Sequence, residues 1–121
     1  MNAHERRQLL LLQALRWRLT KCESADVRQR MLNSYIVGDI ISCRSERVPN
    51  HLINLLKSPS DALRQYMARL INALASLNHG RSYLASNLEL VKLMQTVMRN
   101  EKGNTICKEN LLAALQKLSV R

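Results

Sequence analysis

The side chains that most often carry catalysis or hold metals are scattered along this chain. His4, His51 and His79 are far apart and show neither the HxxxH nor the HExxH spacing of a metal-binding helix. The nine acidic residues are too dispersed for two carboxylates to share one catalytic site. No serine stands in a GxSxG setting, and three isolated glycines cannot form a phosphate-binding loop. We therefore expect no enzymatic activity, no metal and no cofactor.

The cysteines point the same way. Cys22, Cys43 and Cys107 are odd in number, lie far apart and form no CxxC pair. This pattern argues against a disulfide framework and against a zinc site. We expect three reduced, partly buried thiols in a cytosolic protein.

The charge balance indicates the kind of partner. The chain carries a formal net charge of +10, which favours acidic protein surfaces, nucleic acid or anionic lipid. The basic residues are spread over both halves, with no run longer than two. Binding of nucleic acid through phosphates is the alternative function, and it predicts a steep loss of affinity with salt. One Trp and three Tyr leave little for stacking on single strands, so nucleic acid is the less favoured partner.

The composition favours an all-α protein. The chain has no Phe, three Gly and two Pro, so a core of Leu, Ile, Val, Met and Ala is expected. No segment alternates with period two, so no strand is predicted. The apolar run at residues 9–12 is too short for a signal peptide or a membrane span. We expect one domain in the cytoplasm.

Apolar periodicity predicts seven helical segments. They are residues 3–20, 25–36 (or as far as 41), 49–57, 59–77, 81–86, 88–100 and 106–120. Ser24, Ser58 and Thr105 are the expected N-caps, and Pro49 and Pro59 the expected first helical residues. Residues 42–48 are expected to be a loop. Gly80 is expected to end a helix in a left-handed conformation, and Leu11 and Trp17 are expected to widen the buried stripe of the first helix.

One helical segment recurs. Residues 68–77 align with residues 109–118 at a shift of 41, and residues 55–58 align with residues 97–100 at a shift of 42. A helical unit repeated at this period is typical of a solenoid. Solenoids bind macromolecules along an extended surface.

From residue 49 the predicted helices are medium, long, short, medium and long. This order and period resemble the armadillo repeat, a unit of three helices, and the match is good from residue 52 to residue 118. The resemblance implies an all-α, armadillo-like right-handed α-solenoid of about two to three stacked repeats. The expected domain is a single one, 1–121, with divergent N-terminal helices in 1–47 and the clearest repeats in 48–121.

Residues 4–47, which begin HERRQ, and residues 64–77, which begin RQY, further resemble a segment of the LisH-domain-containing armadillo-repeat family of the ciliary base. The resemblance implies a non-enzymatic protein–protein interaction scaffold in a ciliary-base or centrosomal assembly that supports cilium assembly or stability. It implies a place in the cytoplasm or cytoskeleton, at the basal body and centriole. No LisH-like motif is visible, so nothing tied to that module is carried over, and the resemblance implies a short form or a fragment. A larger parent chain or self-association is among the expected partners.

The candidate interaction surface consists of Trp17, Arg64, Arg69, Asn72 and Arg81, and its expected partners are acidic surfaces of centrosomal or ciliary proteins. Two alternatives stay open: Trp17 could be a packing residue, and the arginines could be solvated surface. Peptide-binding armadillo proteins hold a peptide backbone with an Asn, and at the matching positions this chain has Ala73 and Ala114. Asn72 lies about 100° around the helix from Ala73. Capture of an extended basic peptide is therefore not expected.

Overall fold

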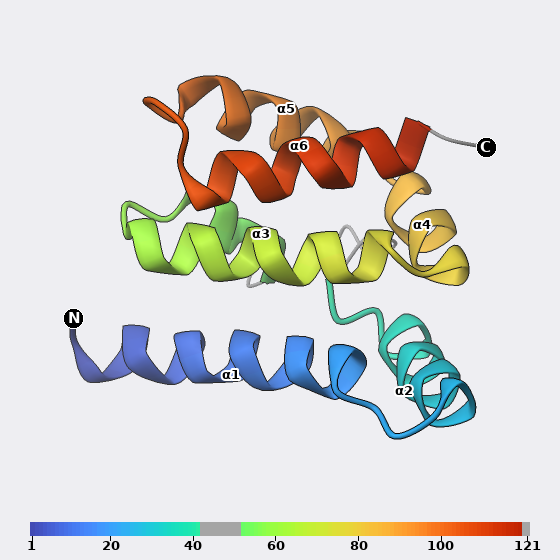
Figure 1. The fold of residues 1–121 in the computed structure, drawn as a ribbon. Helices are drawn as coiled ribbons and strands as arrows, with labels where there is room; N and C mark the ends of the chain where they lie inside the picture. The colour runs from blue at the N-terminus through green and yellow to red at the C-terminus, as the bar shows by residue number, and fades with distance from the viewer. Residues whose placement is uncertain (42–51, 120–121) are drawn as a thin grey trace.

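Six α-helices and one 3₁₀ helix make up the described parts of the chain, residues 1–41 and 52–119, in this computed structural model (Figure 1). They are α1 Ala3–Thr20, α2 Ala25–Val37, η1 Leu52–Lys57, α3 Asp61–Ala75, α4 Asn78–Ala85, α5 Leu88–Asn100 and α6 Ile106–Ser119. These residues contain no strand, so the all-α prediction is confirmed. The predicted loop at 42–48 and the helix start at Pro49 lie outside the described residues, and the domain division between 47 and 48 stays a prediction.

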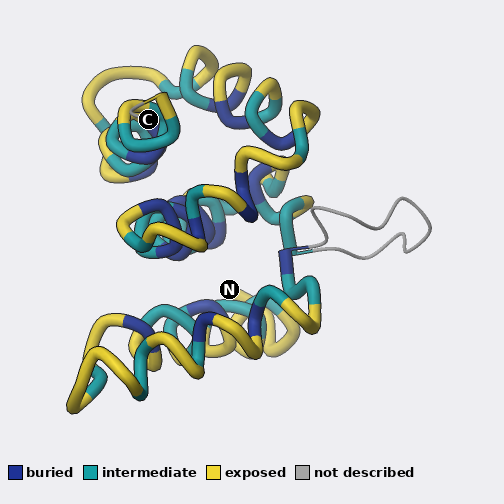
Figure 2. Tube along the Cα trace, turned by 90° about the vertical axis from the view of Figure 1, so that its right-hand side faces the viewer, coloured by how far each residue is buried: buried dark blue, intermediate teal, exposed yellow. Residues whose placement is uncertain are grey.

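Three long helices run side by side in the same direction. α3 lies between α1 and α6, and contacts both of them along its length (Figures 1 and 2). η1 packs against α3 and α5. α5 also packs against α6. α4 contacts α2, α3, α5 and α6. The helices therefore form a row of three with shorter helices packed against it.

Local sequence explains where most helices begin. The Ser24 hydroxyl accepts a hydrogen bond from the Val27 amide, and the Thr105 hydroxyl accepts one from the Lys108 amide at 3.1 Å, as predicted for N-caps. The Asn87 side chain caps α5 in the same way. The predicted helix at 88–100 is confirmed to the residue.

The start of α3 differs from the prediction. Its N-cap is Ser60, whose carbonyl accepts the first helical hydrogen bond from the Arg64 amide at 3.1 Å, so Pro59 precedes the helix. The Ser58 hydroxyl accepts a hydrogen bond from the Ser60 amide at 3.1 Å, whereas the Ser60 hydroxyl accepts one from the Leu63 amide at 3.4 Å. The prediction of Ser58 as the cap was wrong, because its hydroxyl binds within the turn that precedes the helix.

Gly80 was also wrongly placed. It does not end α3 in a left-handed conformation; it is buried inside α4, and the only described glycine with a positive φ is Gly103, at 79°. A Cβ atom on Gly80 would lie 2.0 Å from the Leu74 carbonyl oxygen. Gly80 is therefore required by the close approach of α4 to the end of α3.

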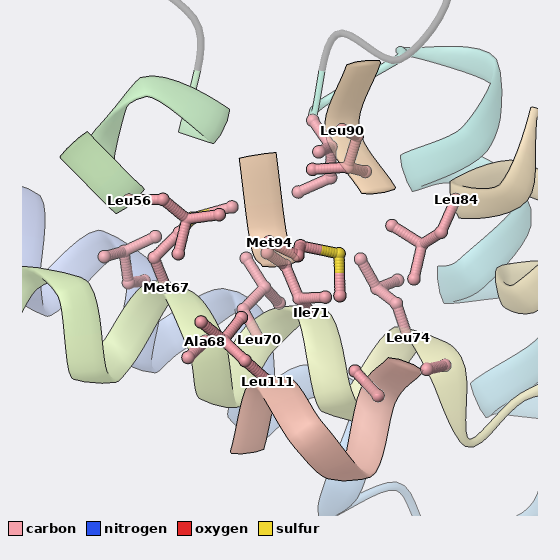
Figure 3. Packing of buried hydrophobic residues seen from close by; sticks show 14 of the residues in the cluster. Leu56, Met67, Ala68, Leu70, Ile71, Leu74, Leu84, Leu90, Met94 and Leu111 are labelled. Atoms are coloured by element: carbon pink, nitrogen blue, oxygen red, sulfur yellow. The ribbon is translucent and has the colours of Figure 1, made fainter. Parts of the chain in front are cut away.

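The core centres on α3. Seven of its residues are buried: Leu63, Met67, Ala68, Leu70, Ile71, Leu74 and Ala75. Figure 3 shows Ile71 and Leu74 beside Met94 of α5, with Leu111 of α6 against the same helix. A helix buried on this many sides is expected when it has neighbours on both flanks.

α1 buries a narrower stripe than predicted. Leu12 and Leu19 are buried, whereas Leu11 is 48% and Trp17 41% exposed. The expectation that Leu11 and Trp17 widen the buried stripe was wrong, because α3 and α2 contact only one side of this helix. No helix of the described residues is long and apolar enough to cross a membrane.

Candidate functional site

A groove of about 450 Å³ crosses the row of three long helices. It is lined by Arg16 and Thr20 of α1, by Arg69, Asn72, Ala73 and Ser76 of α3, and by Ile106, Glu109 and Asn110 of α6. Side chains from three helices therefore meet at one surface. Two of the five predicted interaction residues, Arg69 and Asn72, lie in this groove.

Asn72 organises the polar groups at one end of the groove. Its amide nitrogen donates a hydrogen bond to the Asn110 side-chain oxygen at 3.1 Å, and its own side-chain oxygen accepts one from Lys117 Nζ at 2.9 Å. Lys117 Nζ also donates to Ser76 Oγ at 2.8 Å. The Asn72 side chain of α3 is thus held by two residues of α6, and these hydrogen bonds link the two helices.

Arg69 is the groove side chain with unused donor capacity. It is half-buried, and its guanidinium carbon lies 5.5 Å from the centre of the Tyr66 ring. Its Nε is buried without a hydrogen-bond partner. A buried donor left unpaired costs about 1–3 kcal/mol. A carboxylate entering the groove would be attracted by the charge of the Arg69 guanidinium and by that of Arg16.

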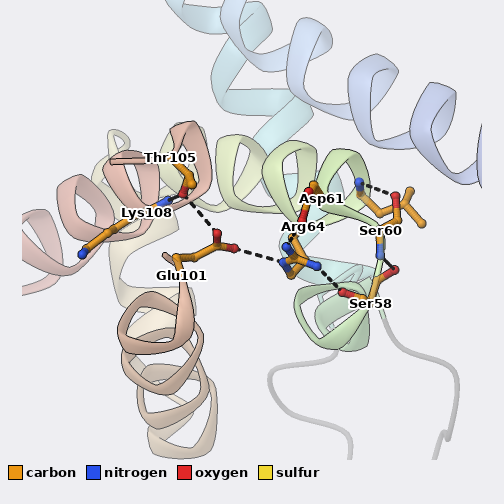
Figure 4. Close-up of polar contacts among 8 residues, drawn as sticks. Ser58, Ser60, Asp61, Arg64, Glu101, Thr105 and Lys108 are labelled. Atoms are coloured by element: carbon orange, nitrogen blue, oxygen red, sulfur yellow. Dashed lines mark hydrogen bonds and ion pairs between the residues drawn. The ribbon is translucent and has the colours of Figure 1, made fainter. Parts of the chain in front are cut away.

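Arg64 belongs to a separate cluster at the start of α3 (Figure 4). Its Nε donates to Glu101 Oε1 at 3.0 Å, and its terminal nitrogens bind Asp61 and the Ser58 carbonyl. Glu101 Oε2 accepts from the Thr105 hydroxyl at 3.2 Å. The Arg64 side chain is only 18% exposed and that of Glu101 only 9%. Arg64 therefore joins the start of α3 to the α5–α6 turn, and it does not lie in the groove.

This cluster shifts the pKa of two groups. Burial alone would raise the pKa of Glu101, but hydrogen bonds from Arg64, Cys107 and Thr105 and the charge of Arg64 outweigh it and lower this pKa. Burial, together with the hydrogen bond to Glu101 and the charge of that carboxylate, raises the pKa of the Cys107 thiol to about 12. Cys107 is therefore a neutral thiol at physiological pH, and it lacks the low pKa of a nucleophilic cysteine.

The other two predicted residues lie elsewhere. Arg81 donates hydrogen bonds to the Ala75 carbonyl at 3.1 Å and to Asn78 Oδ1 at 3.0 Å, so it satisfies the C-terminal end of α3. Trp17 lies on the exposed side of α1 with Lys21 Nζ 4.5 Å from its ring centre. The five predicted residues thus occupy four separate places.

Sequence reasoning missed the groove residues of α1 and α6. The signal was present for α6, because the 41-residue shift aligns Asn110 with Arg69 and Lys117 with Ser76. All four side chains prove to lie in or beside the groove. Arg16 and Thr20 lie outside the sequence repeat, so the repeat did not indicate them as groove residues. The described residues contain no group of His, Cys, Asp and Glu able to hold a metal ion.

An all-helical fold with a polar groove across three helices fits a helical protein-interaction module. Known relatives agree with this class. The protein named LisH domain-containing protein ARMC9 from Mus musculus is 46% identical over 117 residues, which are 97% of this chain and 14% of the relative. The proteins of that name from Homo sapiens and Danio rerio are 45% identical over 97% and 40% identical over 100% of this chain.

The chain is therefore homologous to one segment of the LisH domain-containing ARMC9 proteins. It spans only 14–17% of the length of these curated relatives. No protein-family profile matches it. No solved structure matches it.

Proposed function

We propose that this chain is a non-enzymatic protein–protein interaction scaffold built as an armadillo-like, right-handed α-solenoid. In this proposal α4, α5 and α6 form one three-helix unit, and α2, η1 and α3 form the preceding one. α1 takes the place of the long third helix of a divergent unit before them. The groove across α1, α3 and α6 is the surface that receives the partner.

One contact carries the proposal. Ser76 and Lys117 are equivalent positions of the sequence repeat, and Lys117 Nζ donates a hydrogen bond to Ser76 Oγ at 2.8 Å. Equivalent positions on neighbouring parallel helices are close in space when one unit stacks on the next by translation. This contact therefore supports the interpretation that α3 and α6 are equivalent helices of stacked solenoid units, with α1 next in the row.

The chemistry of the groove supports an acidic protein partner. Arg69 has a buried nitrogen without an acceptor, Arg16 adds a second guanidinium, and the chain as a whole carries +10. Glu109 is the only acid among the groove residues. A peptide segment with exposed carboxylates would be attracted by the Arg69 and Arg16 guanidinium groups and by the net positive charge of the chain.

The assembly that contains this scaffold is proposed from resemblance. The chain resembles a family of the ciliary base and is homologous to a segment of ARMC9 proteins. We therefore place its function in a ciliary-base or centrosomal assembly that supports cilium assembly or stability. Its location would be the cytoplasm or cytoskeleton, at the basal body and centriole.

Proximity labelling with the full chain in ciliated cells tests this function. We expect enrichment of centrosomal and ciliary-base proteins, and loss of that enrichment in an Arg69→Met variant, which keeps the apolar stem but removes the guanidinium. Arg30→Met is the matched control, because Arg30 is an exposed arginine on α2, outside the groove. Equal loss of enrichment in both variants would show that only net charge matters, and would contradict the proposal that the groove receives the partner.

Binding of nucleic acid through its phosphates is the alternative function, and it can be tested with the same chain. Retention on heparin or DNA columns is expected to be lost at or below physiological salt, because the basic residues are dispersed. Retention well above that salt concentration, together with recovery of ribonucleoproteins in the labelling experiment, would overturn the scaffold function.

A further inference from the structure

α1 carries a second apolar stripe on the side turned away from α3. Leu10, Ala14 and Trp17 are spaced i, i+4 and i+7, so they share one face of the helix. All three are exposed, Leu10 by 56% and Trp17 by 41%.

This stripe lies opposite the buried one. A helix turns about 100° per residue, so about 200° separate Trp17 from Leu19, which is 1% exposed. A helix that is apolar on two opposite sides is typical of a helix with a neighbour on each side. α3 is such a helix, because it packs against α1 on one side and α6 on the other. Among the described elements, α1 has α3 and α2 as its main neighbours, and neither covers the outer stripe.

The charges around the outer stripe indicate what would cover it. Arg6, Arg7, Arg18 and Lys21 are all exposed on or beside this face. Lys21 Nζ lies 4.5 Å from the ring centre of Trp17, so a positive charge borders the largest apolar side chain. The single acid of α1, Glu5, lies in its first turn, and its carboxylate accepts a hydrogen bond from Asn2.

This basic border disfavours a second copy of the chain. Two α1 helices packed antiparallel would bring Arg6 and Arg7 of one copy against Arg18 and Lys21 of the other. Two packed parallel would align each basic residue with itself. Like charges repel in both arrangements, whereas acidic residues bordering an apolar stripe would be attracted.

We propose that the outer face of α1, defined by Leu10, Ala14 and Trp17, docks an amphipathic α-helix of another protein whose apolar stripe is bordered by Asp and Glu. The docked helix continues the row formed by α6, α3 and α1. Leu10 and Trp17 supply the buried apolar contacts, and Arg18 and Lys21 pair with the acids of the partner. This surface is separate from the groove and does not depend on the function proposed for it.

Trp17 is the only tryptophan of the chain, so its intrinsic fluorescence reports the docking directly. The probe is a synthetic amphipathic peptide of about 20 residues with a leucine stripe bordered by Glu, long enough to be helical. We expect a saturable blue shift of the Trp17 emission, weakened at about 1 M NaCl, where the Debye length is only ~3 Å. The matched control is the same peptide with Lys in place of every Glu, which is expected to cause no shift.

A variant pair locates the site. Leu10→Asn is expected to weaken binding of the Glu peptide about tenfold, because it removes a leucine side chain from the contact. Leu112→Asn is the control, since Leu112 is a comparably exposed leucine, at 45%, on α6. Circular dichroism checks that both variants keep the helical content of the unmodified protein. Equal binding by both variants would overturn the assignment to α1.

Three other results would overturn the proposal. An equal shift of the Trp17 emission with the Glu and Lys peptides would show that the surface does not select an acidic partner. A blue shift on concentrating the protein alone, with a dimer in sedimentation, would identify a second copy as the occupant. A shift with vesicles rich in phosphatidylserine, but not with the Glu peptide, would identify a membrane surface instead.

Discussion

Arg64 and Glu101 lie 37 residues apart in sequence, yet the Arg64 Nε donates a hydrogen bond to Glu101 Oε1 at 3.0 Å (Figure 4). Both side chains are largely buried. This contact fastens the start of α3 to the turn between α5 and α6. It therefore holds together α3 and α6, two of the three helices that line the groove.

Replacing Glu101 with Ala is expected to destabilise the fold by about 2 kcal/mol, because it leaves the Arg64 guanidinium short of an acceptor in a buried setting. Urea denaturation followed by circular dichroism measures the change. Glu89→Ala is the matched control, because Glu89 is an 84% exposed acid on α5 that pairs with Lys92 at 3.8 Å. The control is expected to lose less than about 0.5 kcal/mol. Equal losses would show that the Arg64 contact adds nothing.

The same contact predicts how stability depends on pH. Burial tends to raise the pKa of Glu101, but the hydrogen bonds from Arg64, Cys107 and Thr105 prevail, and this pKa lies below the ordinary value of 4.5. A carboxyl group whose pKa is lower in the folded state stabilises the fold above its unfolded-state pKa. That contribution is lost as the pH falls through the lower, folded-state pKa.

We therefore expect the melting temperature of the unmodified protein to fall on acidification below the ordinary pKa of 4.5. The difference in melting temperature between this protein and Glu101→Gln should shrink over the same pH range. Thermal melts of both proteins in matched buffers measure it. A difference that stays constant down to the lowest pH would mean that the charge of Glu101 makes no contribution.

Local features of the fold could be predicted from the sequence. The boundaries of α5 and the caps at Ser24 and Thr105 follow from residues within one helical turn, so apolar periodicity and capping rules were sufficient. The repeat shift of 41 also anticipated that α3 and α6 are neighbours. Arg69 and Asn72 could be predicted as interaction residues because they lie on that repeated helix.

Features that depend on tertiary contact could not be predicted. The cap of α3 is Ser60 and not Ser58, because the Ser58 hydroxyl binds the Ser60 amide in the turn before the helix, and both serines are plausible caps from sequence alone. Trp17 looked like a core residue, since periodicity identifies an apolar face but not whether a neighbour covers it. Arg64 looked like surface because its partner, Glu101, lies in a distant turn.

Gly80 is expected to be the glycine least tolerant of substitution. A Cβ there would lie 2.0 Å from the Leu74 carbonyl oxygen, so Gly80→Ala must push α4 away from α3 and cost about 3 kcal/mol, the upper end of the usual range for overpacking. Gly103→Asn is the control, because Gly103 has open space around it and Asn tolerates its φ of 79°, for a cost under about 1 kcal/mol. Thermal melts compare them. If Gly80→Ala melts no lower than Gly103→Asn, the close approach of α4 is refuted.

Asn72 is expected to stabilise the pairing of α3 with α6. Asn72→Ala removes the hydrogen bonds to Asn110 and Lys117 and should cost about 1 kcal/mol, since both are partly exposed. Asn33→Ala is the control, because Asn33 is an exposed residue of α2 that accepts a bond only from Gln29 within its own helix. It should change the free energy of unfolding by less than about 0.5 kcal/mol. Urea denaturation measures both, and a greater loss in the control would contradict the role of Asn72.

Cys107 is expected to resist alkylation in the folded protein. Its side chain is 3% exposed, and burial together with the neighbouring Glu101 raises the pKa of the thiol to about 12, so almost no thiolate exists at about pH 8. Cys22 is half-buried at the end of α1 and should react with iodoacetamide before Cys107 does. Peptide mass spectrometry after timed labelling measures the two rates, and labelling in denaturant provides the reference in which the two thiols react alike. Comparable rates in the folded protein would mean that the α5–α6 turn opens readily, and that the Arg64–Glu101 contact does not keep it closed.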